Sequence, residues 1–193
     1  MNKHLNFMNS YNYYPKTIEE LRKIIEQRIA EEGNEVDLND IYVSEITDMS
    51  HLFSYSNFNG DISKWNVSNV TDMSSMFEGC TVFNQDISKW DVSRVTDMSF
   101  MFDSCKEFNK DISNWDVSNV TDMSYMFYDC ENFNGNISKW DVSNVANMDN
   151  MFYGCKKFNR DISNWNVLKV TNTVYMFDRC LIKDKYKPIF IYK

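Results

Sequence analysis

Apolar residues recur along most of the chain in one fixed order, with polar residues between them. In the copy at residues 86–110, DISKWDVSRVTDMSFMFDSCKEFNK, the order is Ile, Trp, Val, Val, Met, Met, Phe, Cys and Phe. The order returns every 25 residues, as shown by Trp65, Trp90, Trp115, Trp140 and Trp165 and by Cys80, Cys105, Cys130, Cys155 and Cys180. A unit of this length cannot bury its apolar face alone, so the period predicts copies that stack on one another.

The first part of each unit alternates between apolar and polar residues. Trp90 and Val92 are predicted to point inward, and Lys89, Asp91 and Ser93 to point outward. Successive side chains of a β-strand point to opposite faces of a sheet, so this period of two predicts a short strand with one face in the core.

The second part of each unit has the spacing of a helical turn. Thr96 and Asp97 are residue types that cap helix N-termini, and Met98, Met101 and Phe102 follow at helical intervals. We therefore predict a short helical turn that ends near residue 105. The predicted fold is a leucine-rich-repeat-like solenoid, in which each 25-residue coil holds a short parallel β-strand and a short helical turn.

An N-terminal tail and a capping α-helix are predicted over residues 1–34. Thr17 and Glu20 have the spacing of a capping box, and Gly33 supplies a C-terminal stop. One face of this helix is apolar, formed by Ile18, Leu21, Ile24, Ile25 and Ile29. Such a helix would cover the open edge of the first coil, and a helix that binds a partner is the alternative.

Residues 35–193 are predicted to form about six coils and a C-terminal capping strand. The first unit is atypical, with Ile41 in the place of Trp and a step of 24 residues to the next unit. At the other end, Phe190 and Tyr192 fall 25 residues after Trp165 and Val167. We therefore expect a last strand over residues 189–192, entered at Pro188.

Composition and charge narrow the classes of function. The chain has 193 residues, is 43% hydrophobic and carries a formal net charge of −8. This acidity disfavours nucleic acid and anionic membranes as partners, since both attract excess Lys and Arg. No apolar run is long enough for membrane insertion, and the start of the chain lacks the apolar segment of a secretory signal, which favours the cytoplasm.

Residues that could perform catalysis are sparse. The two histidines are His4 and His51, and the five glycines form no phosphate-binding loop. Most Asp residues of the repeat have copies 25 residues away, whereas an active site requires one distinctive pair of carboxyl groups. We therefore predict that the protein is not an enzyme and has no cofactor and no metal.

Two further columns have structural interpretations. The five cysteines are predicted to stack as small buried thiols, with disulfides between coils as the alternative. The Asn that follows Phe in each unit is predicted to be buried and to form a hydrogen-bonded ladder between coils, and its members are Asn59, Asn84, Asn109, Asn134 and Asn159.

The run DISKWDVSNVTDMSxMFxxCxxFN closely resembles the repeats of the BspA-like family of leucine-rich-repeat surface proteins, over roughly residues 17–180. The entry segment ELRKIIEQRIAEEGNEVDLNDIYVSEITDMSHLF is also similar to that family. The resemblance implies a leucine-rich-repeat-like solenoid. For many members it also implies a place on the cell surface and binding to host or matrix proteins. It supplies no catalytic residues.

The outward positions of the predicted strands are the candidate partner-binding face. They are Lys64, Asn66, Lys89, Asp91, Ser93, Asn114, Asp116, Ser118, Lys139, Asp141 and Ser143. A solvated face of mixed charge is the alternative interpretation. A second acidic column could bind calcium or stabilise turns, and its members are Asp61, Asp86, Asp111 and Asp161, with Asn136 between them.

These observations favour a non-catalytic protein–protein interaction module with an unidentified protein ligand. The alternative is a structural protein that assembles with copies of itself into a homo-oligomer.

Overall fold

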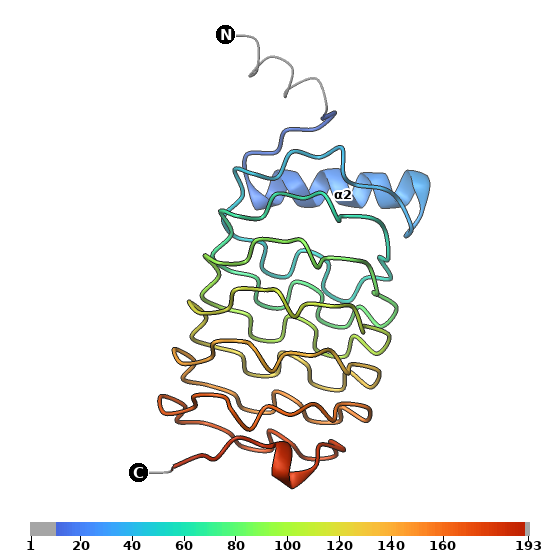
Figure 1. Cartoon of the computed structure of the whole chain (residues 1–193). Coiled ribbons are helices and arrows are strands. Elements are labelled where there is room, and N and C mark those ends of the chain that lie inside the picture. Colours follow the sequence, from blue (N-terminus) through green and yellow to red (C-terminus); the bar gives the residue numbers. More distant parts are fainter. Residues whose placement is uncertain (1–10, 192–193) are drawn as a thin grey trace.

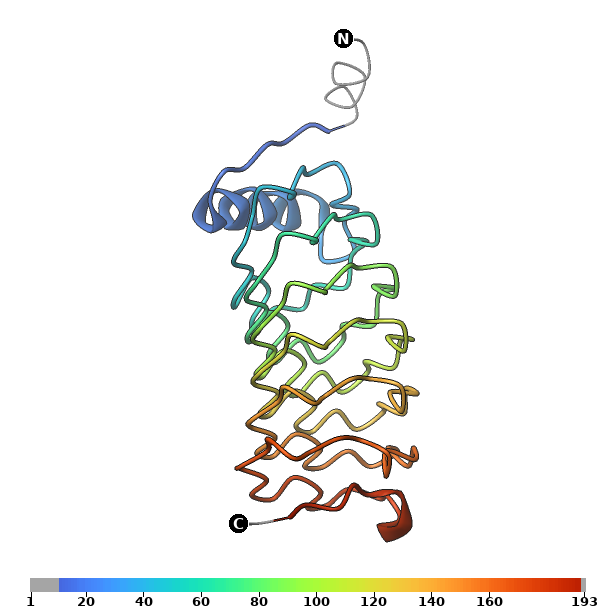
Figure 2. The same cartoon turned by 60° about the vertical axis from the view of Figure 1, so that its left-hand side comes forward.

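The computed structural model describes residues 11–191. Two helical elements are present in this range, α2 (Ile18–Glu32) and the 3₁₀ helix η1 (Asp184–Tyr186). Between them the chain winds through a stack of coils that runs from α2 at one end to η1 near the other (Figure 1). Figure 2 shows from a second side that successive coils lie directly over one another. His4 and Tyr192 lie outside the described residues.

Helix α2 confirms the element predicted from the capping signals. Thr17 is the N-cap, and its Oγ1 accepts a hydrogen bond of 3.2 Å from the backbone N–H of Glu20. The carboxylate of Glu20 accepts from the backbone N–H of Lys16 at 2.7 Å, one residue before the cap. The helix ends at Gly33, whose φ of 93° is a left-handed value that favours glycine.

The helix lies across one end of the stack (Figure 1). Its residues Leu21 and Ile25 are buried in the common core. On its polar side, Arg22 donates from Nη2 to the carbonyl oxygen of Ser50 at 2.7 Å, and Arg28 pairs with Asp40 at 2.9 Å. The helix therefore packs on the first coil through both apolar and charged contacts.

The prediction of a leucine-rich-repeat-like solenoid, with a strand and a helical turn in every coil, is wrong. The coils of the described chain hold neither element and consist of turns and irregular segments. In the segment where the helical turn is expected, three β-turns overlap. They are closed by backbone hydrogen bonds from Met76 to Met73, from Glu78 to Ser75 and from Cys80 to Phe77.

Left-handed residues explain this difference. Ser75 has a φ of 54° and Gly79 a φ of 71°, and later coils repeat the pair at the same positions, as at Phe100 and Ser104. A residue with positive φ belongs to neither a right-handed helix nor an extended strand. Because each coil has two such residues, the segment with helical spacing of apolar residues folds into successive β-turns instead of a helix.

Backbone N–H groups of alternate residues donate hydrogen bonds to the next coil and so join the coils. The N–H groups of Met73 and Phe77 each donate to the next coil, to the carbonyl oxygens of Asp97 and Met101, at 3.0 Å in both cases. The parallel pairing between repeats is limited to single bridges, such as Asp72 with Asp97, and no sheet forms in the described chain. Because every second N–H closes a turn within its own coil, the bonds between coils do not build a continuous strand ladder.

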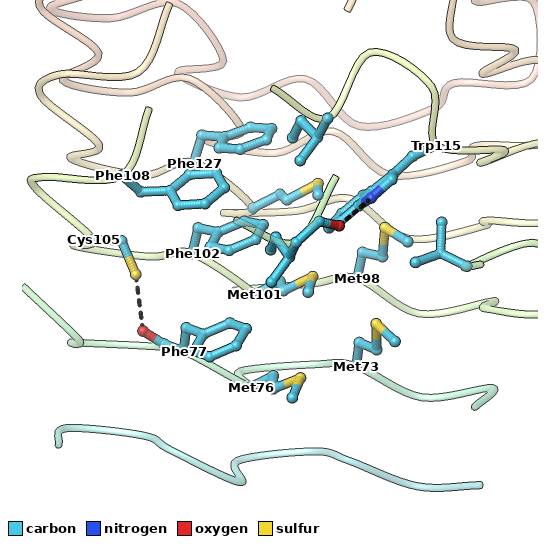
Figure 3. Close-up of a cluster of buried hydrophobic side chains, with 14 of the residues drawn as sticks. Met73, Met76, Phe77, Met98, Met101, Phe102, Cys105, Phe108, Trp115 and Phe127 are labelled. Carbon is cyan, nitrogen blue, oxygen red and sulfur yellow. Dashed lines mark hydrogen bonds between the residues drawn. The ribbon is translucent and has the colours of Figure 1, made fainter. Parts of the chain in front are cut away.

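The apolar positions of the repeat form one continuous core. The Trp, Val, Met, Phe and Cys columns are buried through the middle of the stack, where many side chains have no exposed surface. Rings of successive coils stack nearly parallel, with 5.7 Å between the centroids of Phe102 and Phe127 (Figure 3). The prediction of which residues face inward is therefore confirmed, although the elements that carry them are different.

The predicted C-terminal strand is also wrong. Residues 189–191 are not a strand in the structure, and Ile189 is 82% exposed. Instead η1 brings the carbonyl oxygen of Tyr186 to the backbone N–H of Ile162 at 3.0 Å. Pro188, expected at a strand entry, is buried after this helix. Phe190 is packed against the core without forming part of a strand.

Candidate binding surface

The candidate partner-binding face lies on the surface of the stack. Its Lys, Asn and Asp members are exposed and its Ser members are half-buried. The inward and outward alternation predicted around Trp90 is thus present. A β-turn closed by the hydrogen bond from Trp90 N–H to the carbonyl oxygen of Ile87 produces it in place of a strand.

The aspartates of this face are part of the backbone turns. Oδ1 of Asp91 accepts from the backbone N–H of Ser93 at 3.1 Å, and Asp141 accepts from Ser143 at 3.0 Å. Asn66 makes the same Asx turn to Ser68 at 3.2 Å. The hydrogen bonds from Ser93 lower the pKa of Asp91, because they favour its charged form. Each Asp therefore fixes a turn with one oxygen and can meet a partner with the other.

The lysines of this face are directed toward solvent. Within residues 11–191, Nζ of Lys64, Lys89 or Lys139 takes part in no hydrogen bond and in no ion pair within 4.0 Å. A shallow hollow of about 160 Å³ lies along the face, lined by Ser63, Lys64, Asp86 and Lys89. Two ammonium groups from neighbouring coils thus border one depression with a carboxylate beside them.

The side chains of the second acidic column stabilise turns. Oδ1 of Asp86 accepts from the backbone N–H of Ser88 at 3.0 Å, and Asp111 makes the same bond to Ser113 at 2.9 Å. Asn136 replaces Asp in the same turn, at 3.3 Å from the N–H of Ser138. Among the described residues, no group of three or more His, Cys, Asp or Glu is placed to hold a metal ion.

The asparagine ladder is confirmed. Oδ1 of Asn84 accepts from the backbone N–H of Asn109 at 3.1 Å, and Oδ1 of Asn109 accepts from Asn134 at 2.9 Å. The series starts at Asn59 and continues from Asn159 to the N–H of Lys183. These side chains are half-buried or exposed, so the expectation that they are buried is wrong.

The cysteine column consists of free thiols, as predicted. Four of the five are buried and Cys180 is half-buried. Burial raises the pKa of Cys80 to about 12 and that of Cys130 well above its ordinary value. Sequence reasoning missed that the thiols also donate hydrogen bonds between coils, as from Cys105 to the carbonyl oxygen of Phe77 at 3.0 Å (Figure 3).

A family profile described as "Mycoplasma protein of unknown function, DUF285" matches the chain twice, at residues 20–127 and 105–185. The two matches together span most of the chain, which therefore belongs to this family. No curated protein and no solved structure matches the chain. Within the described residues, no helix is both long enough and apolar enough to cross a membrane.

Proposed function

We propose that the protein is a non-catalytic protein-binding module whose contact surface is the face of Lys, Asp and Ser columns. The observation that carries the proposal is the array of lysines that have no ion-pair partner among residues 11–191, one coil apart and beside aspartates that the turns hold in place. A rigid array loses little conformational entropy when a partner binds. The ammonium and carboxylate groups of neighbouring columns offer charge complementarity to a partner of mixed charge.

The repetition of this face has a consequence for the partner. Because Lys64 and Lys89 occupy the same position in successive coils, one partner motif can bind in more than one register. Repeated weak contacts of this kind add up through effective concentration. The resemblance to BspA-like repeats supports host or matrix proteins as partners and the cell surface as the location.

Side-chain substitutions on this face test the proposal. The variant Asp91→Asn, Asp116→Asn, Asp141→Asn removes three charges and keeps an oxygen for each turn, as Asn66 shows. A second variant replaces Lys64, Lys89 and Lys139 with Gln. Capture of purified matrix and host-surface proteins by the immobilised chain should fall in both variants. The control replaces Lys106, Lys156 and Lys157, exposed lysines outside the face, with Gln. Equal capture by all variants would reject this face.

Self-assembly is the second candidate function, and the C-terminal end of the stack favours it. Leu181 is 68% exposed and Ile191 is 71% exposed at that end. In the described chain, the backbone N–H groups of Tyr175 and Arg179 lack the acceptors that the next coil supplies elsewhere. Unpaired edges and exposed apolar side chains promote association. Light scattering after size exclusion should show mass rising with concentration, and a constant monomer mass would reject this candidate.

A further inference from the structure

A second surface differs from the repetitive face in that its residues change from coil to coil. It lies at three positions of the segment MSxMFxxC, one before the second Met and two between Phe and Cys. The residues at these positions are Ser75, Glu78 and Gly79, then Phe100, Asp103 and Ser104, then Tyr125, Tyr128 and Asp129, then Asn150, Tyr153 and Gly154, then Tyr175, Asp178 and Arg179. Ser75, Asn150 and Gly154 are buried, and the others are at least partly exposed. A surface with a unique composition in each coil can hold a partner in one register, which a uniform surface cannot.

Aromatic rings form a column along this surface. Phe100 stacks on Tyr125 with 4.5 Å between ring centroids, and Tyr128 stacks on Tyr153 at 4.7 Å. The centroids of Tyr125 and Tyr128 are 5.5 Å apart, so the two stacks join. All four residues are half-buried, and each ring therefore keeps part of its surface in solvent.

The backbone under this column is strained. Phe100 and Tyr125 both have a φ of 57°, a left-handed conformation that bulky side chains rarely adopt. In two other coils the same position is occupied by Ser75 and Asn150. Asn adopts this conformation more readily than an aromatic residue does. Strain held at half-buried aromatic residues points to a role in recognition, since the fold alone would be served by Asn.

Carboxylates lie beside the rings. Oδ1 of Asp129 lies where a Cβ on Gly154, the neighbour of Tyr153, would be, and Oδ1 of Asp103 accepts from Oγ of Ser104 at 2.7 Å. Partial burial and, less strongly, the negative charges of Asp129 and Asp103 raise the pKa of Tyr128. Within residues 11–191, no Lys, Arg or His lies within 4.0 Å of either Asp. Ring faces and unpaired carboxylates both attract cations.

One cation of the chain already occupies the end of this column. The guanidinium of Arg179 lies over the ring of Tyr153, with 5.3 Å from Cζ to the ring centroid. Tyr128 and Tyr125 continue the column away from Arg179. The structure thus shows with its own residue how a planar cation fits against this surface.

We propose that the column of Phe100, Tyr125, Tyr128 and Tyr153, with Asp103 and Asp129, binds an arginine-bearing segment of a partner protein. The guanidinium groups stack on the tyrosine rings and donate hydrogen bonds to the carboxylates. Arginine suits this surface better than lysine, because its planar group stacks on rings and donates in two directions. This site is separate from the Lys, Asp and Ser face and holds whether or not that face binds a partner.

A hexa-arginine peptide, with hexa-lysine for comparison, tests the site by calorimetry on the full chain in about 0.15 M salt. The wild type should bind hexa-arginine more tightly than hexa-lysine. Asp103→Asn with Asp129→Asn should weaken hexa-arginine binding about tenfold, the loss expected for two contacts of about 0.7 kcal/mol each. Asp116→Asn with Asp141→Asn makes the same change in net charge on the other face and should weaken it less than about twofold.

Two further variants complete the test, one that changes the tyrosine rings and one that removes Arg179. Tyr128→Leu with Tyr153→Leu keeps apolar bulk and should weaken hexa-arginine binding about fivefold. Arg179→Asn removes the guanidinium that covers the ring of Tyr153 and would compete with the peptide, so this substitution should strengthen binding. Asn is chosen because it accepts the positive φ of this position. Equal weakening by the two Asp pairs, equal binding of both peptides, or an unchanged affinity after the Tyr substitutions would each overturn the proposal.

Discussion

The indole Nε1–H of Trp115 donates a hydrogen bond of 3.2 Å to the backbone carbonyl oxygen of Ile87 in the preceding coil (Figure 3). Every Trp of the repeat makes the equivalent bond, to Leu38, Ile62, Ile87, Ile112 or Ile137. The ring of Trp115 also lies 6.3 Å from that of Phe102. Each Trp therefore fills the core and gives a second donor to a carbonyl oxygen that already closes a turn within its own coil.

Substitution of Trp115 separates these two contributions. Trp115→Ala should lower the free energy of unfolding by roughly 3–5 kcal/mol, because it removes a large buried ring. Trp115→Phe keeps a ring but removes one of the two donors to the carbonyl oxygen of Ile87, which retains the backbone N–H of Trp90, so it should cost about 0.5–1.5 kcal/mol. Urea unfolding measures both, with Val82→Ala as a half-exposed control near neutral. An unchanged midpoint for Trp115→Ala would remove this residue from the core.

A single substitution can remove one hydrogen bond of the asparagine ladder. Oδ1 of Asn109 accepts the backbone N–H of Asn134, so Asn109→Ala should lower the free energy of unfolding by about 1 kcal/mol. Asn109→Asp retains an oxygen at the same place and should lose less. If Ala and Asp destabilise the chain equally in urea, the side-chain oxygen is not the stabilising group.

The period and the inward positions of the repeat were readable from the sequence, because burial depends on which residues are apolar. The backbone conformation of the coil could not be predicted from the sequence. The spacing of Met98, Met101 and Phe102 fits a helical turn, but Phe100 and Ser104 take positive φ values that interrupt it. Phe and Ser do not signal that conformation in this copy, because they seldom adopt it. The available signal was in other copies, where Gly79, Asn150 and Gly154 occupy the same positions.

The candidate face was predicted as exposed, and it is exposed. The structural task of its aspartates was missed, although the spacing Asp-x-Ser is the signal of an Asx turn, as Asp91 and Ser93 show. The aromatic column was missed for a different reason. Tyr128 and Asp103 are 25 residues apart and vary between units, so a search for repeated patterns passes over them.

Thiol reactivity should follow burial along the cysteine column. Cys105, Cys130 and Cys155 are fully buried, and burial raises their pKa values far above the ordinary range, so little thiolate forms at neutral pH. Cys180 is half-buried at the end of the stack. Iodoacetamide added to the native protein should therefore label Cys180 first, as read by peptide mass spectrometry. Labelling of Cys130 at the same rate would contradict the buried column, and denatured protein supplies the full-labelling control.

Asp103 should make stability depend on pH. Burial, and less strongly the charges of Glu78 and Asp129, raise its pKa from 3.8 to about 6. The folded chain then binds this proton more tightly than the unfolded chain, so the stabilisation is complete below about pH 4 and is lost as the pH rises through 6. Asp103→Asn removes the charge and should stabilise the protein at pH 7.5, by on the order of 2 kcal/mol, with a smaller gain at pH 4.5.

Asp141→Asn is the matched control, because its sign is opposite. Hydrogen bonds from Ser143 lower the pKa of Asp141, so its contribution is present above its ordinary pKa and is lost as the pH falls. Because pH 4.5 still lies above the ordinary pKa of 3.8, this substitution should destabilise the protein nearly equally at pH 7.5 and pH 4.5. Urea unfolding of the wild type and both variants at the two pH values measures the differences. An Asp103→Asn gain that is the same at both pH values would show that this carboxyl group is not protonated near pH 6.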